Sequence, residues 1–359
     1  MVVCARKETR AHGAGRMRGT VAEMRNPIRA YRMRWKRRRL LFRALRKRRQ
    51  LAAVADRSAQ LRKGQILLFS TMRNEALRLP FFLEHYRKIG VDHFLIVDNA
   101  SDDGTGELLA GQPDVSLWRT DASYKLARFG MDWLTWLQAR YGHGHWCLTV
   151  DADEIFIYPD WENRSLAGLV AGLEAVGRRS YGALMLDLYP RGRLSAHPYR
   201  AGQDPCDILQ WFDAGNYEFR YQPDLQNLLI RGGVRSRMFF AEDPARAPTL
   251  SKTPLVFWNR RHAYVSSTHS LLPPRLNHVR SRHPPHPPSG VLLHTKFLHM
   301  VIGKSREDRI RRQHFENGAL FQAYYEALID DPVLWNADSI RYRGWRQLVA
   351  LGLMHDDRP

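Results

Sequence analysis

The sequence has few cysteines: Cys4, Cys147 and Cys206 are the only three in 359 residues. Three is an odd number, the spacing is not that of metal ligands, and a disulfide framework needs paired cysteines. The cysteines therefore give no sign of a disulfide-stapled fold or a zinc site. They favour a reducing compartment.

Long apolar runs are missing as well. A membrane-spanning helix needs roughly 18 to 20 consecutive apolar residues, and no stretch of the sequence approaches this length. The basic residues at the N-terminus are not followed by the apolar segment of a secretory signal. We therefore expect a cytoplasmic protein, soluble or peripheral at the inner face of the plasma membrane. With 44% apolar residues, it can bury the core of one large domain or two modest ones.

Acidic residues are scarce in the first 63 positions. This segment has 21 Lys or Arg against only Glu8, Glu23 and Asp56, a net charge of +18 out of +20 for the whole chain. The other 296 residues carry +2, which is ordinary for an enzyme. Residues 1–63 are therefore predicted to form a basic tail that is partly helical or disordered.

A helix is predicted from about Pro27, with Trp35, Phe42 and Leu45 set among arginines. One interpretation is that residues 26–50 contact an anionic membrane surface through charge and a few buried apolar groups. The other is a solvated basic extension. A third is that translation begins later, at Met17, Met24 or Met33, so that up to residues 1–32 are not part of the protein.

From Gln65 onward, strands and helices alternate. Short apolar runs indicate strands at 66–70, 92–97, 115–119 and 146–150, and helical spacing indicates helices at 75–89 and 127–141. Repeated strand–helix–strand units predict a parallel sheet, and such α/β sheets bind ligands at the carboxyl ends of their strands.

The second half is less regular. The pattern predicts a helix at 166–175, strands at 181–188, 227–230, 255–258 and 291–294, a Pro/His-rich loop at 273–288, and helices at 305–328 and 346–353. No internal repeat is present.

The sharpest motif is Asp151-Ala152-Asp153-Glu154, directly after a buried strand. Crowded carboxylates raise one another's pKa, and a divalent cation removes that cost. Asp151 and Asp153 lie two apart on an extended backbone and so point the same way. Both can face Mn²⁺ or Mg²⁺, which takes oxygen ligands and completes its shell with substrate phosphates. The alternative is an acidic loop that caps the next helix.

Three segments together resemble the family 2 glycosyltransferases of the GT-A fold. They are Met72-Arg73-Asn74-Glu75-Ala76, the run from Phe94 to Thr105, and Asp151-Ala152-Asp153-Glu154. The resemblance is closest to a bacterial branch in which an Arg-Asn-Glu segment opens the domain, and it spans about 65–299.

The resemblance implies a GT-A-like α/β fold with a doubly wound, mostly parallel sheet flanked by helices. The catalytic domain would cover 64–300, with a nucleotide-binding half at 64–160 and an acceptor half at 161–300. Residues 301–359 would form a helical extension.

It also implies roles for individual residues. The donor nucleotide would be bound by Thr71, Asn74, Asp98, Asn99 and Asp151; the metal by Asp151, Asp153 and His294; and the diphosphate by Lys296 and Arg235. Turn chemistry alone also explains Asp98, Asn99 and Ser101. Gly232-Gly233 fits either a tight turn or close backbone approach to a ligand.

Family members usually invert configuration, which requires a carboxylate to deprotonate the acceptor hydroxyl. The candidates are Glu218, Asp213 and Asp187, with Glu218 preferred, and each fits a structural salt bridge equally well.

The predicted function is metal-dependent transfer of a sugar from a nucleoside diphosphate, such as a UDP-sugar, to a glycan or lipid-linked acceptor. A nucleotidyltransferase with the same acidic metal site is one alternative. A polyanion or nucleic-acid binder acting through the basic tail is another, disfavoured because the body has no recognition motif. A transferase-like binding protein without activity is the third.

Overall fold

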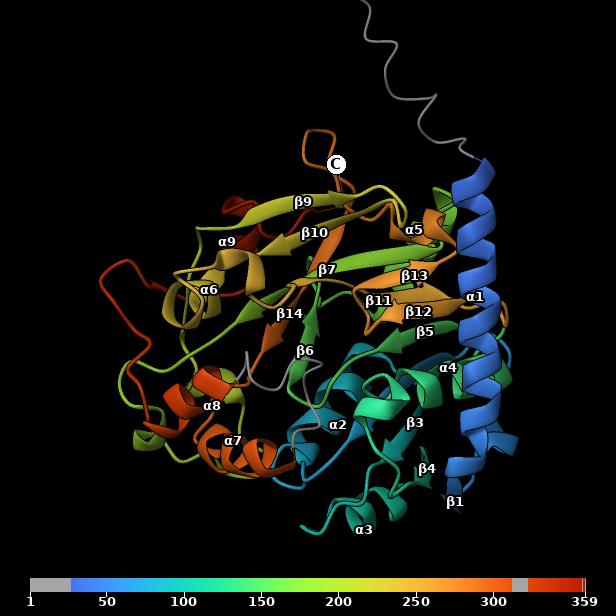
Figure 1. Cartoon of the computed structure of the whole chain (residues 1–359), viewed down its shortest axis with the longest axis horizontal. Helices are drawn as coiled ribbons and strands as arrows, with labels where there is room; N and C mark the ends of the chain where they lie inside the picture. The colour runs from blue at the N-terminus through green and yellow to red at the C-terminus, as the bar shows by residue number, and fades with distance from the viewer. Residues whose placement is uncertain (1–26, 312–321, 357, 359) are drawn as a thin grey trace, which may run out of the picture.

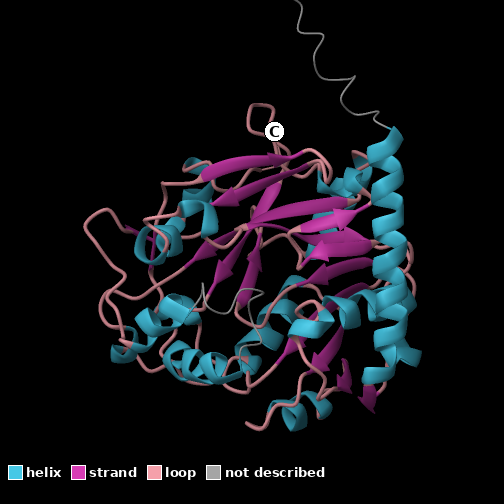
Figure 2. Cartoon of the chain, viewed as in Figure 1, coloured by secondary structure: helices cyan, strands magenta, loops and turns pink. Residues whose placement is uncertain are grey.

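The computed structural model describes residues 27–311, 322–356 and 358, and its centre is a large mixed β-sheet flanked by helices (Figures 1 and 2). Within these residues the main sheet has nine strands in the order β1-β4-β3-β2-β5-β11-β7-β14-β6. A central sheet flanked by helices confirms the predicted α/β fold class.

The first half of the sheet follows the predicted alternation. β2, β3, β4 and β5 are parallel neighbours, connected through helices. The elements are β2 (Ile66–Met72), α2 (Leu79–Ile89), β3 (His93–Asp98), α3 (Thr105–Ala110), β4 (Val115–Arg119), α4 (Met131–Tyr141) and β5 (Trp146–Thr149).

The second half mixes strand directions. β11 runs antiparallel to both β5 and β7, β14 runs parallel to β7, and β6 and β1 are antiparallel edge strands. The elements are β1 (Ala52–Ala55), β6 (Glu154–Ile157), α5 (Leu166–Ala175), β7 (Ser180–Asp187), β11 (Ser251–Phe257) and β14 (Ser289–His294).

Smaller elements complete the molecule. They are the strand pairs β8 (Trp211–Phe212) with β15 (Ile340–Arg341), β9 (Glu218–Gln222) with β10 (Asn227–Arg231) and β12 (Ala263–Ser266) with β13 (Ser270–Leu272), and the helices α6 (Gly233–Phe239), α7 (Met300–Arg311), α8 (Gln322–Ile329) and α9 (Trp345–Ala350).

Buried side chains alternate between the two faces of the sheet, as the two-residue period of a strand requires. On β2, Ile66 and Leu68 join the cluster with α2, α3 and α5, whereas Leu67 and Phe69 join the cluster with α4 and β12. A third cluster, around β7 and β14, includes side chains of α6 to α9. Both halves of the sheet are thus fixed by apolar packing.

The helix α1 (Pro27–Lys47) comes from the predicted tail and packs against the body along one side of the molecule (Figure 1). Its buried Met33 and Leu40 form one apolar cluster with Ala263 and Leu272 of the β12–β13 hairpin, and Ala44 is buried as well. Arg43 donates to the fully buried Asp132 of α4 at 2.9 Å. Part of the basic segment is therefore integral to the fold.

Two predicted helices differ in the structure. The helix expected from Glu75 begins at Leu79 instead. Pro80 suits the first turn of a helix, where its missing N–H costs nothing, and Asn74 is in the left-handed region with φ of 52°. The helix expected over 305–328 is instead α7 and α8, and residues 312–321 lie outside the described part of the chain.

Gly290 of β14 allows close approach of the edge strand β6. A Cβ atom at this position would lie 2.5 Å from the carbonyl oxygen of Ile157. We expect Gly290→Ala to lower the free energy of unfolding by about 1–3 kcal/mol, since a well-packed core cannot absorb an added methyl group without strain. Urea unfolding followed by circular dichroism measures this change.

The matched control is Gly168→Ala in α5. There the added Cβ would meet its nearest atom at 3.5 Å. Alanine is favoured over glycine in a helix by up to about 1 kcal/mol, so this variant should be as stable as the parent or more so. Equal effects of the two substitutions would contradict the steric account.

Candidate functional site

A cavity of about 370 Å³ lies beyond the carboxyl ends of the central parallel strands. Several residues predicted from the sequence line it together, although they come from distant segments. These are Thr71, Asn99, Asp151, Asp153, Arg235, His294 and Lys296.

Asp98 and Asn74 are not among the lining residues. The buried carboxylate of Asp98 accepts hydrogen bonds from the backbone N–H of Ser101 at 3.1 Å and from its hydroxyl. Asn74 Oδ1 accepts from the backbone N–H of Asp102 at 3.0 Å. These contacts join the loops after β2 and β3, as the turn interpretation expects. A nucleotide contact by either residue stays a prediction.

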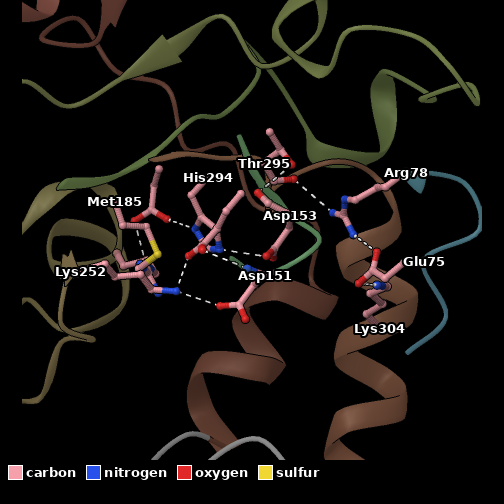
Figure 3. A network of polar contacts seen from close by, with 12 residues as sticks. Glu75, Arg78, Asp151, Asp153, Met185, Lys252, His294, Thr295 and Lys304 are labelled. Carbon is pink, nitrogen blue, oxygen red and sulfur yellow. Dashed lines mark hydrogen bonds and ion pairs between the residues drawn. The ribbon is translucent and has the colours of Figure 1, made fainter. Parts of the chain in front are cut away.

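Lys252 of β11 contacts two of the three carboxylates of the acidic motif, and Figure 3 shows its contact with Asp151. Its ammonium lies 2.8 Å from Asp151 Oδ2 and also binds Glu154. Burial alone would lower the pKa of Lys252, but the two carboxylates outweigh burial and raise it. Burial raises the pKa of Glu154 to about 7, against the opposing effect of Lys252. Lys252 thus supplies the positive charge that such a carboxylate cluster requires.

Asp153 faces His294 instead. His294 Nε2 lies 3.2 Å from Asp153 Oδ2, and His294 Nδ1 lies 2.5 Å from Asp187 Oδ1. Arg235 Nε donates to the second oxygen of Asp187 at 2.8 Å. Burial would lower the pKa of His294, but the two carboxylates outweigh it and raise this pKa. The imidazole is therefore held in one orientation, with Nε2 directed at Asp153.

The pKa of Asp153 is well below its usual range. Burial alone would raise it, but the nearby charges of His294, Arg78 and Lys296 outweigh burial. Asp153 is therefore ionised at neutral pH. A carboxylate kept ionised in a mostly buried position is suited to bind a cation.

A second set of polar side chains lines another side of the cavity (Figure 3). Glu75, in the turn after β2, binds Arg78 at 2.9 Å and also binds Lys304 of α7. Arg78 also donates to the backbone oxygen of Thr295 at 3.1 Å. This group connects the first βα loop to the segment after β14.

The side chains at the cavity provide only some of the ligands that a manganese ion needs. A carboxylate and an imidazole, those of Asp153 and His294, meet at one point, and both are ligand types that Mn²⁺ accepts. The third predicted ligand, Asp151, is paired with Lys252. Among the described residues, no group of three or more His, Cys, Asp or Glu side chains is arranged to hold a metal. Substrate phosphates would have to supply the remaining ligands.

The three predicted base candidates do not line the cavity. Glu218 is exposed on the hairpin strand β9. Asp213 is bound by Arg237 at 2.8 Å and by the hydroxyl of Tyr189. Asp187 is buried between Arg235 and His294. The role of each as base stays a prediction, and the salt bridges match the structural alternative for Asp213 and Asp187.

The paired glycines have a steric explanation. Gly232 precedes α6 with φ of 137°, and a Cβ there would lie 2.3 Å from the carbonyl oxygen of Asn216. Asn216 also accepts from the N–H of Gly233 at 2.8 Å. The close approach is thus to the protein's own backbone, and it orients α6, which carries Arg235.

Sequence reasoning missed several cavity residues. Lys252 could have been recognised from the sequence, because it is the one charged residue of the strand Ser251–Phe257, whose other residues are apolar or neutral. No feature of the sequence marks His269, which lines the cavity from the β12–β13 turn. Burial and the nearby charge of Lys252 lower the pKa of His269 to about 4. Arg78 and Lys304 were missed because contacts between distant segments of the chain bring them to the cavity.

No helix in the described ranges has the length and apolar character needed to cross a bilayer. No family model matches the chain, and a search of curated proteins also gives no match.

Proposed function

We propose that the chain is a glycosyltransferase of GT-A type that moves a sugar from a nucleoside diphosphate donor, such as a UDP-sugar, to a glycan or lipid-linked acceptor. One observation carries the proposal. Asp151, Asp153, His294 and Lys296, singled out from separate sequence motifs, line one cavity at the carboxyl ends of parallel strands. This is where open α/β sheets bind nucleotides.

The charge of the cavity favours a diphosphate. Its lining has six Lys or Arg against four Asp or Glu. The positive residues are Arg73, Arg78, Arg235, Lys252, Lys296 and Lys304. A phosphate group that entered would meet an excess of positive charge. Among these cations, Lys296 is not held by any of the carboxylate pairs described above, and it is a suitable point charge for phosphate.

Asp153 and His294 would hold the divalent cation, Mn²⁺ or Mg²⁺, together with the donor. When bound, such a cation supplies Lewis-acid stabilisation of the departing diphosphate. Asp187 fixes the imidazole by accepting from Nδ1, and Arg235 fixes Asp187. Partner groups of this kind orient metal-binding histidines and keep them in one tautomer.

Inverting transfer also needs a base for the acceptor hydroxyl. The earlier candidates Glu218, Asp213 and Asp187 remain, and the cavity lining adds Glu75 and Glu307. Glu75 is bound to Lys304 and Arg78, and Glu307 lies 3.0 Å from Arg73. Both carboxylates lie inside the cavity, within reach of an acceptor that entered it.

Calorimetric titration with UDP, in the presence and absence of Mn²⁺, tests the proposal. We expect binding that depends on Mn²⁺ in the parent protein and that is lost in Asp153→Ala. Asp114→Asn is the matched control, because this carboxylate pairs with Arg87 outside the cavity. It should bind UDP as the parent does.

The proposal fails if UDP, GDP and dTDP all leave the calorimetric baseline unchanged under every metal condition. A nucleoside triphosphate that bound and released pyrophosphate would instead identify a nucleotidyltransferase.

A further inference from the structure

The helix α1 has two apolar faces, and only one of them is used by the fold. Met33 and Leu40 are buried against the β12–β13 hairpin, and Ala44 on the same side of the helix is also buried. On the outer side, Tyr31, Trp35, Phe42 and Leu45 have 55%, 53%, 59% and 41% of their surface exposed. At 3.6 residues per turn these four side chains fall within a stripe about 80° wide, on the side of the helix away from Leu40. We call them the outer stripe.

The outer stripe is surrounded by positive charge. Residues 27–47 contain ten Lys or Arg and no Asp or Glu. Exposed arginines flank the stripe, with Arg34 on one side and Arg39 and Arg46 on the other, and Arg38 lies within it. The guanidinium of Arg38 lies 5.6 Å from the ring centroid of Trp35.

The positive surface extends onto the body. The pKa of Arg37 is lowered by partial burial and by the positive charges of Arg261 and Arg275, so these three cations lie near one another. Large exposed apolar groups framed by like charges mark an interaction surface rather than a merely solvated helix. The partner must therefore offer both negative charge and an apolar interior.

We propose that the outer stripe and its arginines dock the protein on an anionic phospholipid bilayer. Amphipathic helices that lie in a membrane interface combine basic residues with Trp, Phe and Leu on one face, and they draw strength from both anionic headgroups and buried apolar area. The ring of Trp35 suits the headgroup level, where amphipathic aromatic side chains gather.

Other partners match the surface less well. A nucleic acid would be drawn by the arginines, but Phe42 and Leu45 add nothing to phosphate binding. A second copy of the chain would bring ten further positive charges against the first ten. The bilayer is the partner that uses both components of the surface, independently of what the cavity binds.

Co-sedimentation with vesicles tests this proposal, using phosphatidylcholine alone and phosphatidylcholine mixed with phosphatidylglycerol. The full chain is expected to bind the anionic vesicles and not the neutral ones, with weaker binding as salt is raised. Trp35→Ser with Phe42→Ser should weaken binding at least about tenfold, because the buried apolar area is lost while the charge is kept.

The matched control is Phe219→Ser with Tyr221→Ser, an aromatic pair that is 47% and 57% exposed on β9. It should bind vesicles as the parent does. Arg38→Gln with Arg39→Gln should also weaken anionic binding, which separates the charge contribution from the apolar one. Circular dichroism confirms that each variant is folded.

Three outcomes overturn the proposal. The first is no binding to anionic vesicles by the parent. The second is equal binding by the parent and the Trp35/Phe42 variant. The third is binding to RNA that outcompetes the vesicles and does not respond to loss of the aromatic pair, which would assign the surface to nucleic acid.

Discussion

Replacing Lys252 with methionine is expected to lower the free energy of unfolding by about 3–5 kcal/mol, the range measured when one partner of a buried ion pair is removed. The Lys252 side chain is 4% exposed and that of Glu154 is fully buried. Without the ammonium, Glu154 would have to ionise in a buried site beside Asp151 and Asp153, or remain protonated at neutral pH. Both states are costly, so the folded state loses stability. Urea unfolding at neutral pH measures the loss.

The double variant Lys252→Met with Glu154→Gln separates charge from packing. It removes both charges of the buried pair and keeps the side-chain volumes, so most of the stability should return. Lys63→Met, at an exposed lysine, should change the free energy of unfolding by less than about 0.5 kcal/mol. If the double variant were as unstable as Lys252→Met, the loss would have to come from packing, and the electrostatic account would be wrong.

Asp153→Asn is expected to reduce the rate of donor cleavage by about 10³-fold or more. The substitution keeps the shape of the side chain but removes the negative charge that faces His294 and, in the proposed function, the cation. Removing one electrostatic contact to the developing charge of a transition state costs on the order of 10²–10³-fold, and losing the metal ion costs further stabilisation. Release of UDP from a UDP-sugar, followed by a coupled assay, gives the rate.

Two further variants sharpen this experiment. Asp151→Asn should cost less, about 10–100-fold, because Asp151 is paired with Lys252 and acts on the site through that contact. Asp160→Asn makes the same change after β6, where the carboxylate binds Arg358 outside the cavity, and it should leave the rate unchanged. Retention of full activity in Asp153→Asn would remove this residue from the mechanism.

The parallel half of the sheet could be predicted from the sequence because its signals are local. β2, β3, β4 and β5 are short apolar runs separated by segments with helical spacing, and strands joined by such helical crossovers are expected to lie parallel in one sheet. The insertion of β11 between β5 and β7 could not be predicted. It depends on strand pairing between segments about a hundred residues apart, and no periodic pattern in the sequence indicates such a pairing.

The same distinction applies to the candidate site. Asp151 and Asp153 stand out because acidic residues directly after a buried strand require a positive partner. The sequence suggested a metal ion as that partner, but for Asp151 and Glu154 the structure supplies Lys252 from β11. The docking of α1 was also missed, because its sequence is dominated by ten positive charges, and the few apolar residues that pack against the body, such as Met33 and Leu40, do not stand out among them.

The position of the β12–β13 hairpin links the two surfaces discussed above. Its strands pack against α1, whereas its turn residues Ser266 and Ser267 line the cavity. A chain that began at Met33 would still carry Leu40 and Ala44 but would lose the first turns of the helix, including Arg29, which pairs with Asp224 at 3.0 Å. A chain shortened in this way would hold the β12–β13 hairpin, and with it one wall of the cavity, less firmly than the full chain does.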